Sequence, residues 1–193
     1  MNRKEQKKET RIKILKAAYK VYSTIGFNAS TLTIAKEANV SHGTIFVHFP
    51  TLSDLQISLI EEFANNIANE MHNLCQSNSS IESLLFHHLD MLIKYEDFYS
   101  NLIRDLVLLP DEVKFYFANL QVTIAFHFNQ VFEREIENKN IKNISVHMLF
   151  NSWISLVHYY LLNKDLFAPN RSVIKSYKDE LIKTYISLIS IDK

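Results

Sequence analysis

Apolar residues recur every three or four positions along most of the chain, which is the spacing of one face of an α-helix. The first such stretch covers residues 9–26 and ends at Gly26, a residue suited to a helix C-terminus. Two short stretches follow at residues 32–38 and 41–49, and Pro50 closes the second. Because each is too short to be stable alone, the pattern predicts two short helices that pack against their neighbours.

Longer helical patterns fill the rest of the chain. Ser53 and Gln56 form a candidate capping box at the start of the fourth helix, and a polar, linker-like run at residues 77–80 follows that helix. One face of the fourth helix carries Leu55, Leu59, Phe63, Ile67 and Met71. Further helices are predicted over residues 81–95, 98–109, 111–138, 145–162 and 171–190.

The composition also favours an all-α fold. The 193 residues include two glycines and three prolines, too few for the turns of a β-sandwich or a Rossmann-type sheet. The single cysteine, Cys75, excludes an intrachain disulfide and fits a reducing compartment. We find neither the apolar run of a signal peptide nor a window of the roughly 18 apolar residues that span a membrane. We therefore expect a cytoplasmic protein.

Charge is divided unevenly between the two ends of the chain. Residues 1–60 carry nine Lys and Arg against four Asp and Glu, a net charge of +5. Residues 61–193 carry twelve against seventeen, a net charge of −5. A basic segment of this size suits contact with a polyanion, although chance patterning over 60 residues explains it equally well.

The last two predicted helices carry apolar residues on two faces each. In the final helix, one stripe runs through Ile174, Leu181 and Leu188, and Ile182 and Ile189 lie beside it. One face more than a monomer core needs indicates a partner interface, so we expect a homodimer through the last two helices. The alternative is a thick monomer core.

The short helices over "TLTIAKEANVSHGTIFVHF" (residues 31–49) have the features of a helix-turn-helix. Ala35 and Ala38 supply the small residues that two steeply crossing helices need at their contact. Ser41 caps the second helix, and Ile45 and Phe49 are spaced to turn inward. The outer side then carries His42, Thr44, Val47 and His48, which suit base edges in a DNA major groove.

Residues 9–58 resemble the N-terminal DNA-binding domain of the TetR family of bacterial transcriptional regulators. The resemblance rests on "ILKAAYKVYSTIGFNAST" and "IAKEANVSHGTIFVHFPTLSDL", in which about a dozen positions agree in order. It implies a helix-turn-helix domain over residues 1–52 and a helical ligand-binding and dimerisation domain over residues 53–193. The DNA-binding residues that it implies are Thr31, Thr33, Lys36, Ser41, His42, Gly43, Thr44, Phe46, Val47 and His48.

Three departures from the family pattern concern phosphate contacts and the turn. Phe46 stands where the family usually has a phosphate-binding tyrosine, and Leu52 where a lysine is common. Asn39 replaces a frequent glycine in the turn. We expect phosphate affinity to depend more on the basic residues of the same segment, which are Lys7, Lys8, Arg11, Lys13 and Lys36.

Aromatic residues concentrate in the C-terminal two-thirds, where 18 of the 23 lie beyond residue 60. An apolar cavity with a few polar groups is the usual form of a small-molecule site, although core packing explains each aromatic residue taken singly. We expect no metal and no cofactor. The candidate effector-binding residues are Phe86, Phe98, Tyr99, Arg104, Phe115, Phe126, His127, Asn151, Trp153 and His158.

These observations predict a ligand-responsive repressor that leaves a palindromic DNA operator when it binds a small, mostly apolar molecule. Ligand binding would tilt the fourth helix and change the separation of two recognition helices, which DNA holds at about 34–36 Å. An enzyme is not expected, because no Gly-rich phosphate loop or catalytic motif is present. The alternative is a helical protein-interaction adaptor with a weakened DNA-binding head, a possibility that Phe46 and Leu52 raise.

Overall fold

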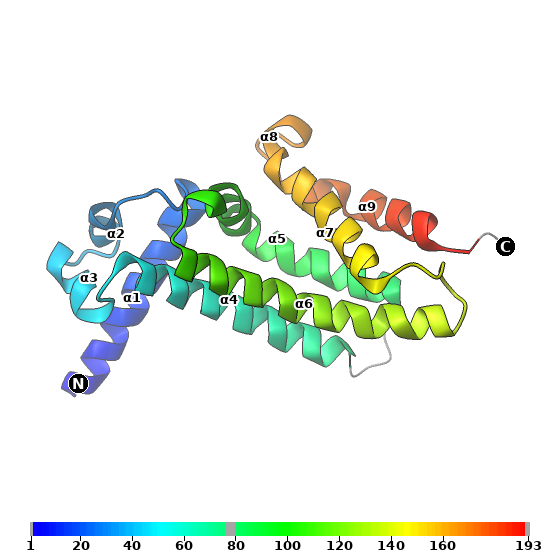
Figure 1. The fold of residues 1–193 in the computed structure, drawn as a ribbon. Helices are drawn as coiled ribbons and strands as arrows, with labels where there is room; N and C mark the ends of the chain where they lie inside the picture. Colours follow the sequence, from blue (N-terminus) through cyan, green and yellow to red (C-terminus); the bar gives the residue numbers. More distant parts are fainter. Residues whose placement is uncertain (1, 76–79, 192–193) are drawn as a thin grey trace. The chain divides into compact units, whose positions relative to one another are not determined.

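The computed structural model describes residues 2–75 and 80–191, and α-helices build nearly all of that part of the chain (Figure 1). Those residues form no β-strand, and one isolated β-bridge joins Ile141 to Ser190. The all-α prediction, with an N-terminal helix-turn-helix followed by a helical region, is confirmed. The helices are α1 (Arg3–Thr24), α2 (Thr31–Glu37), α3 (His42–His48), α4 (Leu52–Cys75), α5 (Ile81–Asp105), the 3-10 helix η1 (Leu106–Leu108), α6 (Asp111–Glu137), α7 (Val146–Leu162), α8 (Lys164–Phe167) and α9 (Val173–Ile189).

Some helix boundaries differ from those expected. Helix α1 begins six residues early, because Asn2 and Glu5 form a capping box at its N-terminus. The helices predicted over residues 81–95 and 98–109 form the single helix α5 and the 3-10 turn η1. The linker-like run at 77–80 lies outside the described residues except for Ser80, whose Oγ accepts from the N–H of Ser83 and caps α5.

The cap predicted at Ser53 and Gln56 is wrong. Helix α4 begins at Leu52, and its capping pair is Thr51 and Asp54. The N–H of Asp54 donates to Thr51 Oγ1 over 3.0 Å, and the N–H of Thr51 donates to Asp54 Oδ2 over 2.9 Å. Gln56 is buried instead. Pro50 ends the preceding segment so close to α4 that the nearest hydroxyl, Thr51, becomes the cap.

The chain divides into two compact units. Unit 1 comprises Met1–Ala64 and Asp97–Ala118, and unit 2 comprises Asn65–Glu96 and Asn119–Lys193. Helices α4, α5 and α6 therefore contribute residues to both units. The domain boundary expected after residue 52 stays a prediction.

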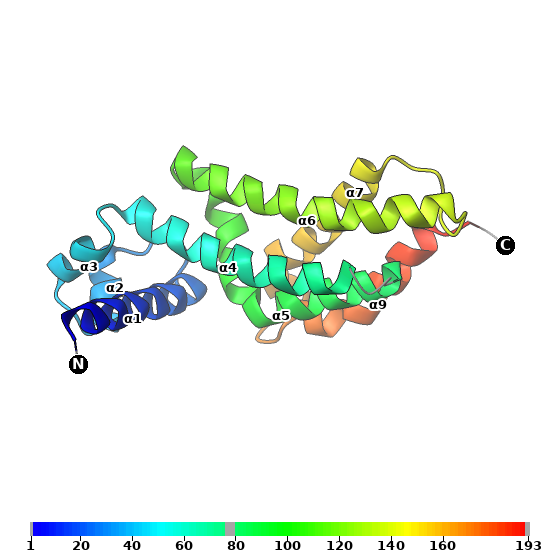
Figure 2. The ribbon, with the colours of Figure 1, turned by 90° about the horizontal axis from the view of Figure 1, so that it is seen from below.

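Unit 1 holds α1, α2 and α3 around a small core. Figures 1 and 2 show α2 and α3 as two short helices joined by a tight turn beside α1. Ile34, Ala35 and Ala38 are buried, as the helix-turn-helix pattern predicted. An aromatic cluster completes this core, in which Phe98 of α5 contacts Tyr19 of α1 as well as Phe27, Phe63 and their neighbours.

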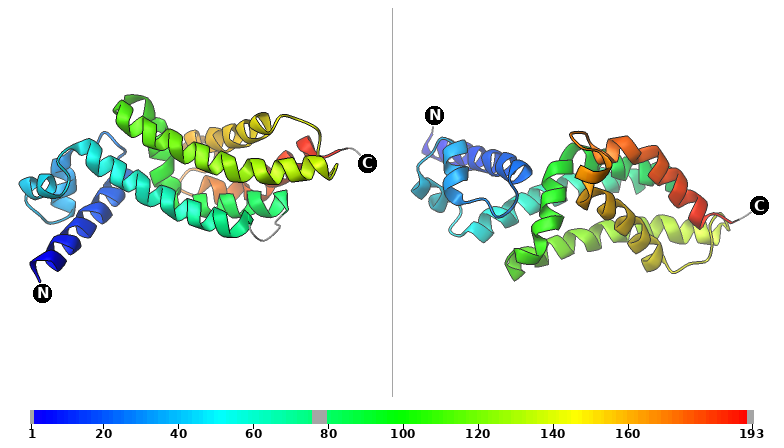
Figure 3. Two further views of the ribbon diagram at one scale, coloured as in Figure 1. Left: turned by 60° about the horizontal axis from the view of Figure 1, so that its bottom comes forward. Right: turned by 90° about the horizontal axis from the view of Figure 1, so that it is seen from above.

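The core of unit 2 includes Trp153 of α7, which is fully buried and packs against Tyr185 of α9. Helices α7 and α9 run alongside each other, and α8 lies in the connection between them (Figures 1 and 3). The carboxylate of Glu96 on α5 accepts from the N–H groups of Val173 and Ile174 and so caps the N-terminus of α9.

The two apolar stripes of α9 are used mainly within the chain. Ile174, Leu181, Ile182 and Ile189 are all buried, so the stripes do not by themselves provide a spare face. The apolar side chains of α7 and α9 that stay exposed are Met148, Tyr159, Leu162 and Leu188. Dimerisation through these helices stays a prediction, and this smaller set is the surface on which it depends.

Candidate nucleic-acid interface

The turn between α2 and α3 is closed by the C-terminal cap of α2. The N–H of Val40 donates to the carbonyl of Ala35 over 3.0 Å, and that of Asn39 donates to Lys36 over 3.1 Å. This pattern is a Schellman motif with Asn39 at the left-handed position, where its φ is +47°. Asparagine tolerates that conformation better than other non-glycine residues, which explains why it can replace the usual glycine.

The start of α3 is fixed by a short hydroxyl network. Ser41 Oγ accepts from the N–H of Thr44 over 3.2 Å and lies 2.7 Å from Thr44 Oγ1. Ser30 and Thr33 repeat the arrangement at the start of α2, with 3.2 and 3.0 Å. Each threonine hydroxyl has one donor and two acceptor positions, so it keeps hydrogen-bonding capacity for a partner while its rotamer is held.

His42 joins the two short helices on their outer side. Its Nε2 lies 2.8 Å from Thr31 Oγ1 at the start of α2, and its ring meets Phe46 edge-on with 5.2 Å between the centroids. Phe46 is 40% exposed and Val47 68%. Ile45 and Phe49 are buried, as expected from their spacing. The outer face of α3 therefore presents an oriented imidazole, a threonine and two apolar side chains.

Gly43 lies on the same side and has open space around it. A Cβ built on this residue meets no heavy atom within 4 Å. The fold therefore does not require glycine here, and helix propensity disfavours it. A partner that approaches the α3 backbone closely would require it.

Arg11 fastens the end of α3 to the helices on either side. Its Nη1 donates to the carbonyl of His48 and its Nη2 to Ser58 Oγ, both over 3.1 Å. The guanidinium also lies 4.1 Å from the ring centroid of Phe49. Arg11 was expected among the phosphate-binding residues, and these three contacts give it a structural role. Two other members of that set, Lys13 and Lys36, lie on the α1–α2 side, where Lys13 Nζ is 3.5 Å from the carbonyl of Asn39.

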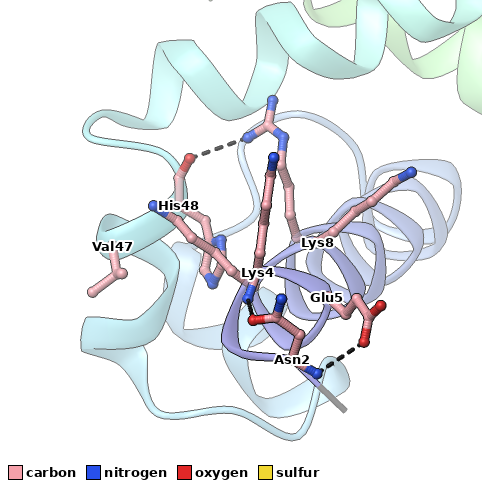
Figure 4. A pocket seen from close by; sticks show the side chains of 8 residues that line it. Asn2, Lys4, Glu5, Lys8, Val47 and His48 are labelled. Atoms are coloured by element: carbon pink, nitrogen blue, oxygen red, sulfur yellow. Dashed lines mark hydrogen bonds between the residues drawn. The ribbon is translucent and has the colours of Figure 1, made fainter.

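A basic pocket of about 570 Å³ lies between the N-terminal half of α1 and the end of α3 (Figure 4). We call it the α1–α3 pocket. The pKa of His48 is lowered there by burial and by the positive charges of Lys7 and Arg11. The lining residues are Asn2, Lys4, Glu5, Lys7, Lys8, Arg11, Val47 and His48.

The C-terminus of α1 is held by two α5 side chains that the sequence pattern did not single out. Asn101, which is buried, donates to the carbonyls of Tyr22 and Ser23 over 2.8 and 2.9 Å. Asp105 accepts from the N–H of Phe27 over 2.8 Å. Burial by itself raises the pKa of Asp105. The hydrogen bonds from Arg104 and Phe27 and the charge of Arg104 together outweigh burial, so the pKa lies below its ordinary value.

Gly26 makes that contact possible. Its φ is +104°, and a Cβ there would lie 2.4 Å from Arg104 Nη2 and 2.6 Å from Asp105 Oδ2. The sequence marked Gly26 as a helix end. The contacts of this helix end with Asn101 and Asp105 could not be predicted from the sequence pattern, because these residues lie about 80 positions further along the chain.

Comparison with models of known protein families identifies the region of the chain that contains α1, α2 and α3. Residues 14–56 match the model of the bacterial regulatory proteins of the tetR family. The N-terminal region belongs to the TetR family. The resemblance noted in the sequence is thereby confirmed. A comparison with curated proteins finds no match.

Solved structures of TetR-family and other transcriptional regulators share the fold along nearly the whole chain. A TetR-family regulator from Agrobacterium tumefaciens has a TM-score of 0.79 and 16% identity, over 96% of this chain and 100% of that one. FadR from Bacillus subtilis, solved with stearoyl-CoA, has a TM-score of 0.74 and 17% identity, over 91% and 97%. A regulator from Saccharomonospora viridis, solved with choline, has a TM-score of 0.79 and 13% identity, over 96% and 100%.

The candidate effector-binding residues are distributed over both units of the chain. In unit 1, Phe98 and Tyr99 are buried in the aromatic core, while Arg104 pairs with Asp105 and Phe115 is exposed. In unit 2, Trp153 is buried and His158 partly buried, whereas Phe126 and Asn151 are exposed. His127 is partly buried, and Phe86 lies beneath the ammonium of Lys178. The exposed side chains do not line an interior volume, and effector binding by the set stays a prediction.

One buried histidine lay outside that set. Trp153 Nε1 donates to His88 Nδ1 over 3.3 Å, and the His88 ring meets Phe128 edge-on. Burial, with a smaller contribution from His158, lowers the pKa of His88 to about 3, and burial lowers that of His158 to about 4. Residues 2–75 and 80–191 hold no group of three or more metal-binding side chains. No helix in that part of the chain is long and apolar enough to cross a membrane.

Proposed function

We propose that this protein is a DNA-binding transcriptional repressor that leaves its operator when a small, mostly apolar molecule binds. The observation that carries the proposal is the outer face of α3. It combines oriented hydrogen-bonding groups at His42 and Thr44 with open space over Gly43. A surface of this kind suits close approach to base edges in a major groove.

The proposed roles follow the chemistry of each side chain. His42 and Thr44 hydrogen-bond to base edges, and Val47 contacts a thymine methyl group. Thr31, Thr33 and Lys36 on α2, and His48 at the end of α3, contact the sugar-phosphate backbone and fix the register. Ser41 orients Thr44, while Phe46 holds the ring of His42 in place.

The effector-binding part of the proposal rests on unit 2 and on the related regulators. FadR from Bacillus subtilis was solved with stearoyl-CoA and the Saccharomonospora viridis regulator with choline. Trp153, His158 and His88 provide an apolar interior with a few polar atoms, which is the usual character of a small-molecule site.

Helix α5 is proposed to couple effector binding to the DNA-binding helices α1, α2 and α3. It is one unbroken helix that caps α9 through Glu96 and holds the end of α1 through Asn101 and Asp105. A ligand that shifts α5 would displace the end of α1, and with it the α2–α3 pair that packs on α1.

We further propose a homodimer, with Met148, Tyr159, Leu162 and Leu188 at the interface. Two copies would place two α3 helices on a palindromic operator with half-sites about one DNA turn apart. A dimer is required by this mechanism because one short helix contacts too few bases for a specific site.

The test is a gel-shift titration of the purified protein against DNA from its own upstream region. We expect a salt-sensitive, sequence-specific complex of one dimer per site. A His42→Ala variant, which leaves the buried residues of α3 unchanged, is expected to lose specificity and to keep non-specific binding. Absence of any specific complex would instead favour the adaptor, and tight binding to a palindrome by a monomer would overturn the dimer mechanism.

A further inference from the structure

The α1–α3 pocket has a concentration of positive charge that the fold does not use. Lys4, Lys7, Lys8 and Arg11 are spaced so that one face of α1 carries all four. Arg11 is engaged by His48, Ser58 and Phe49. The three lysines are exposed, and the described residues contain no ion pair of theirs.

The acidic residue of the pocket has another task. The Glu5 carboxylate accepts from the N–H of Asn2 over 2.8 Å as part of the capping box. This cap continues α1 as far as Arg3, so the lysines stand on a regular helix. The pocket therefore keeps an unbalanced positive charge.

Helix stability does not account for this arrangement. Cations near the N-terminus of a helix are unfavourable because the backbone dipole is positive at that end. Lys4 lies in the first turn of α1, and Lys7 and Lys8 lie in the second. Lys7 and Arg11 line the pocket together with His48, and their positive charges add to burial in lowering the pKa of that imidazole.

The position of the pocket selects the ligand. Val47 and His48 line one side of it, and both belong to the helix proposed to enter the major groove. A DNA backbone phosphate flanks that groove wherever the helix lies in it. The geometry points to the α1–α3 pocket as a binding site for a DNA backbone phosphate, with Lys4, Lys7 and Lys8 as its ligands and Arg11 as a positioning residue.

This inference rests on the proposed function and adds a contact to it. The phosphate-binding hydroxyl and ammonium lost at Phe46 and Leu52 are replaced by ammonium groups from the first two turns of α1. The N-terminal half of α1 is then part of the DNA-binding surface rather than a solvent-exposed extension.

The experiment measures the salt dependence of binding to a duplex from the upstream region. The variant carries Lys4→Gln, Lys7→Gln and Lys8→Gln. The control carries Lys16→Gln, Lys139→Gln and Lys175→Gln, which removes the same charge from exposed lysines outside the pocket. Since each phosphate contact contributes a slope of about 0.9, we expect the variant slope to fall by about two units or more and the control slope to fall by less than about one.

Specificity gives a second readout. The variant should weaken binding to operator and to unrelated duplex by about the same factor, because phosphate contacts carry no sequence information. Equal slopes for wild type, variant and control would overturn the inference and leave the proposed function intact. Failure of the wild-type protein to bind any duplex would overturn both.

A third measurement separates DNA from a free anion. Calorimetry with inorganic phosphate should give no more than weak binding, because one free phosphate gains none of the neighbouring contacts of a duplex. Tight phosphate binding that the lysine variant abolishes, together with an unchanged DNA slope, would identify the pocket as a free-anion site and overturn the inference.

Discussion

The outer face of α3 and the interior of unit 2 use histidine in opposite ways. His42 is exposed and is oriented by Thr31 across a tight turn, whereas His88 is fully buried and accepts from Trp153, 65 residues away. The first position follows from a local motif, and the second depends on three helices coming together. The sequence alone could therefore place His42 on an outer face but could not place His88 in the interior.

We expect the largest loss of unfolding free energy from a substitution in the interior of unit 2. Trp153→Ala removes the indole from a fully buried position and leaves His88 Nδ1 without its donor. We expect a loss of about 3–5 kcal/mol in unfolding free energy. Denaturant titration measures it. Leu166→Ala, at a position 73% exposed, is the control and should change stability by less than about 0.5 kcal/mol.

Lowering the pH should destabilise the fold through the two histidines His88 and His158, which burial keeps neutral. The pKa values of His88 and His158 are about 3 and about 4 in the fold, against about 6.5 when unfolded. Below pH 6.5 the unfolded chain binds more protons, so stability is complete above that pH and falls as the pH decreases. We expect a loss of about 2–3 kcal/mol at pH 5.5. Unfolding at pH 7.5 and 5.5 measures it, and His158→Gln should remove about half; an unchanged midpoint would contradict the buried, neutral state.

The two glycines give the sharpest comparison. Gly43→Ala should stabilise the fold by up to about 1 kcal/mol, because its site is open and helical. The same change should weaken operator binding on the order of tenfold if DNA approaches this backbone. Gly26→Ala, at a φ of +104°, should cost about 1–3 kcal/mol of stability. Thermal melts measure the stability of both variants, and gel shifts measure their affinity for DNA. Unchanged DNA affinity for Gly43→Ala would contradict a close approach of DNA to the α3 backbone.

We expect the smallest effect, a change in DNA affinity, at Phe46, which stands where the family usually has a phosphate-binding tyrosine. Phe46 is 40% exposed, so Phe46→Tyr adds a hydroxyl without disturbing a core. We expect the affinity for the operator to rise a few-fold while the salt slope stays unchanged, because a neutral hydroxyl adds a hydrogen bond to a phosphate but releases no counterion. Gel-shift titration of both proteins measures the affinity, and an unchanged affinity would mean that this face of α3 does not meet the backbone.

Sequence patterns predicted the head of the protein better than the rest. Ala35, Ala38 and Ile45 were expected to be buried, and they are. The cap of α4 was misplaced because Thr51 and Ser53 are both suitable hydroxyls, and only the backbone path after Pro50 chooses between them. The candidate effector-binding residues could not be sorted, because apolar spacing does not distinguish a core aromatic such as Phe98 from an exposed one such as Phe115.

Local sequence patterns alone were enough to predict most of the helices, the turn at Asn39 and the outward residues of α3. Those features depend on interactions between residues at most five positions apart, which the local order of side chains specifies. Only the tertiary structure assigned Arg11 to the end of α3, Asn101 to the end of α1 and Glu96 to the start of α9. These contacts join residues 37 to 79 positions apart, and no local spacing rule encodes which distant carbonyl or N–H a polar side chain will reach.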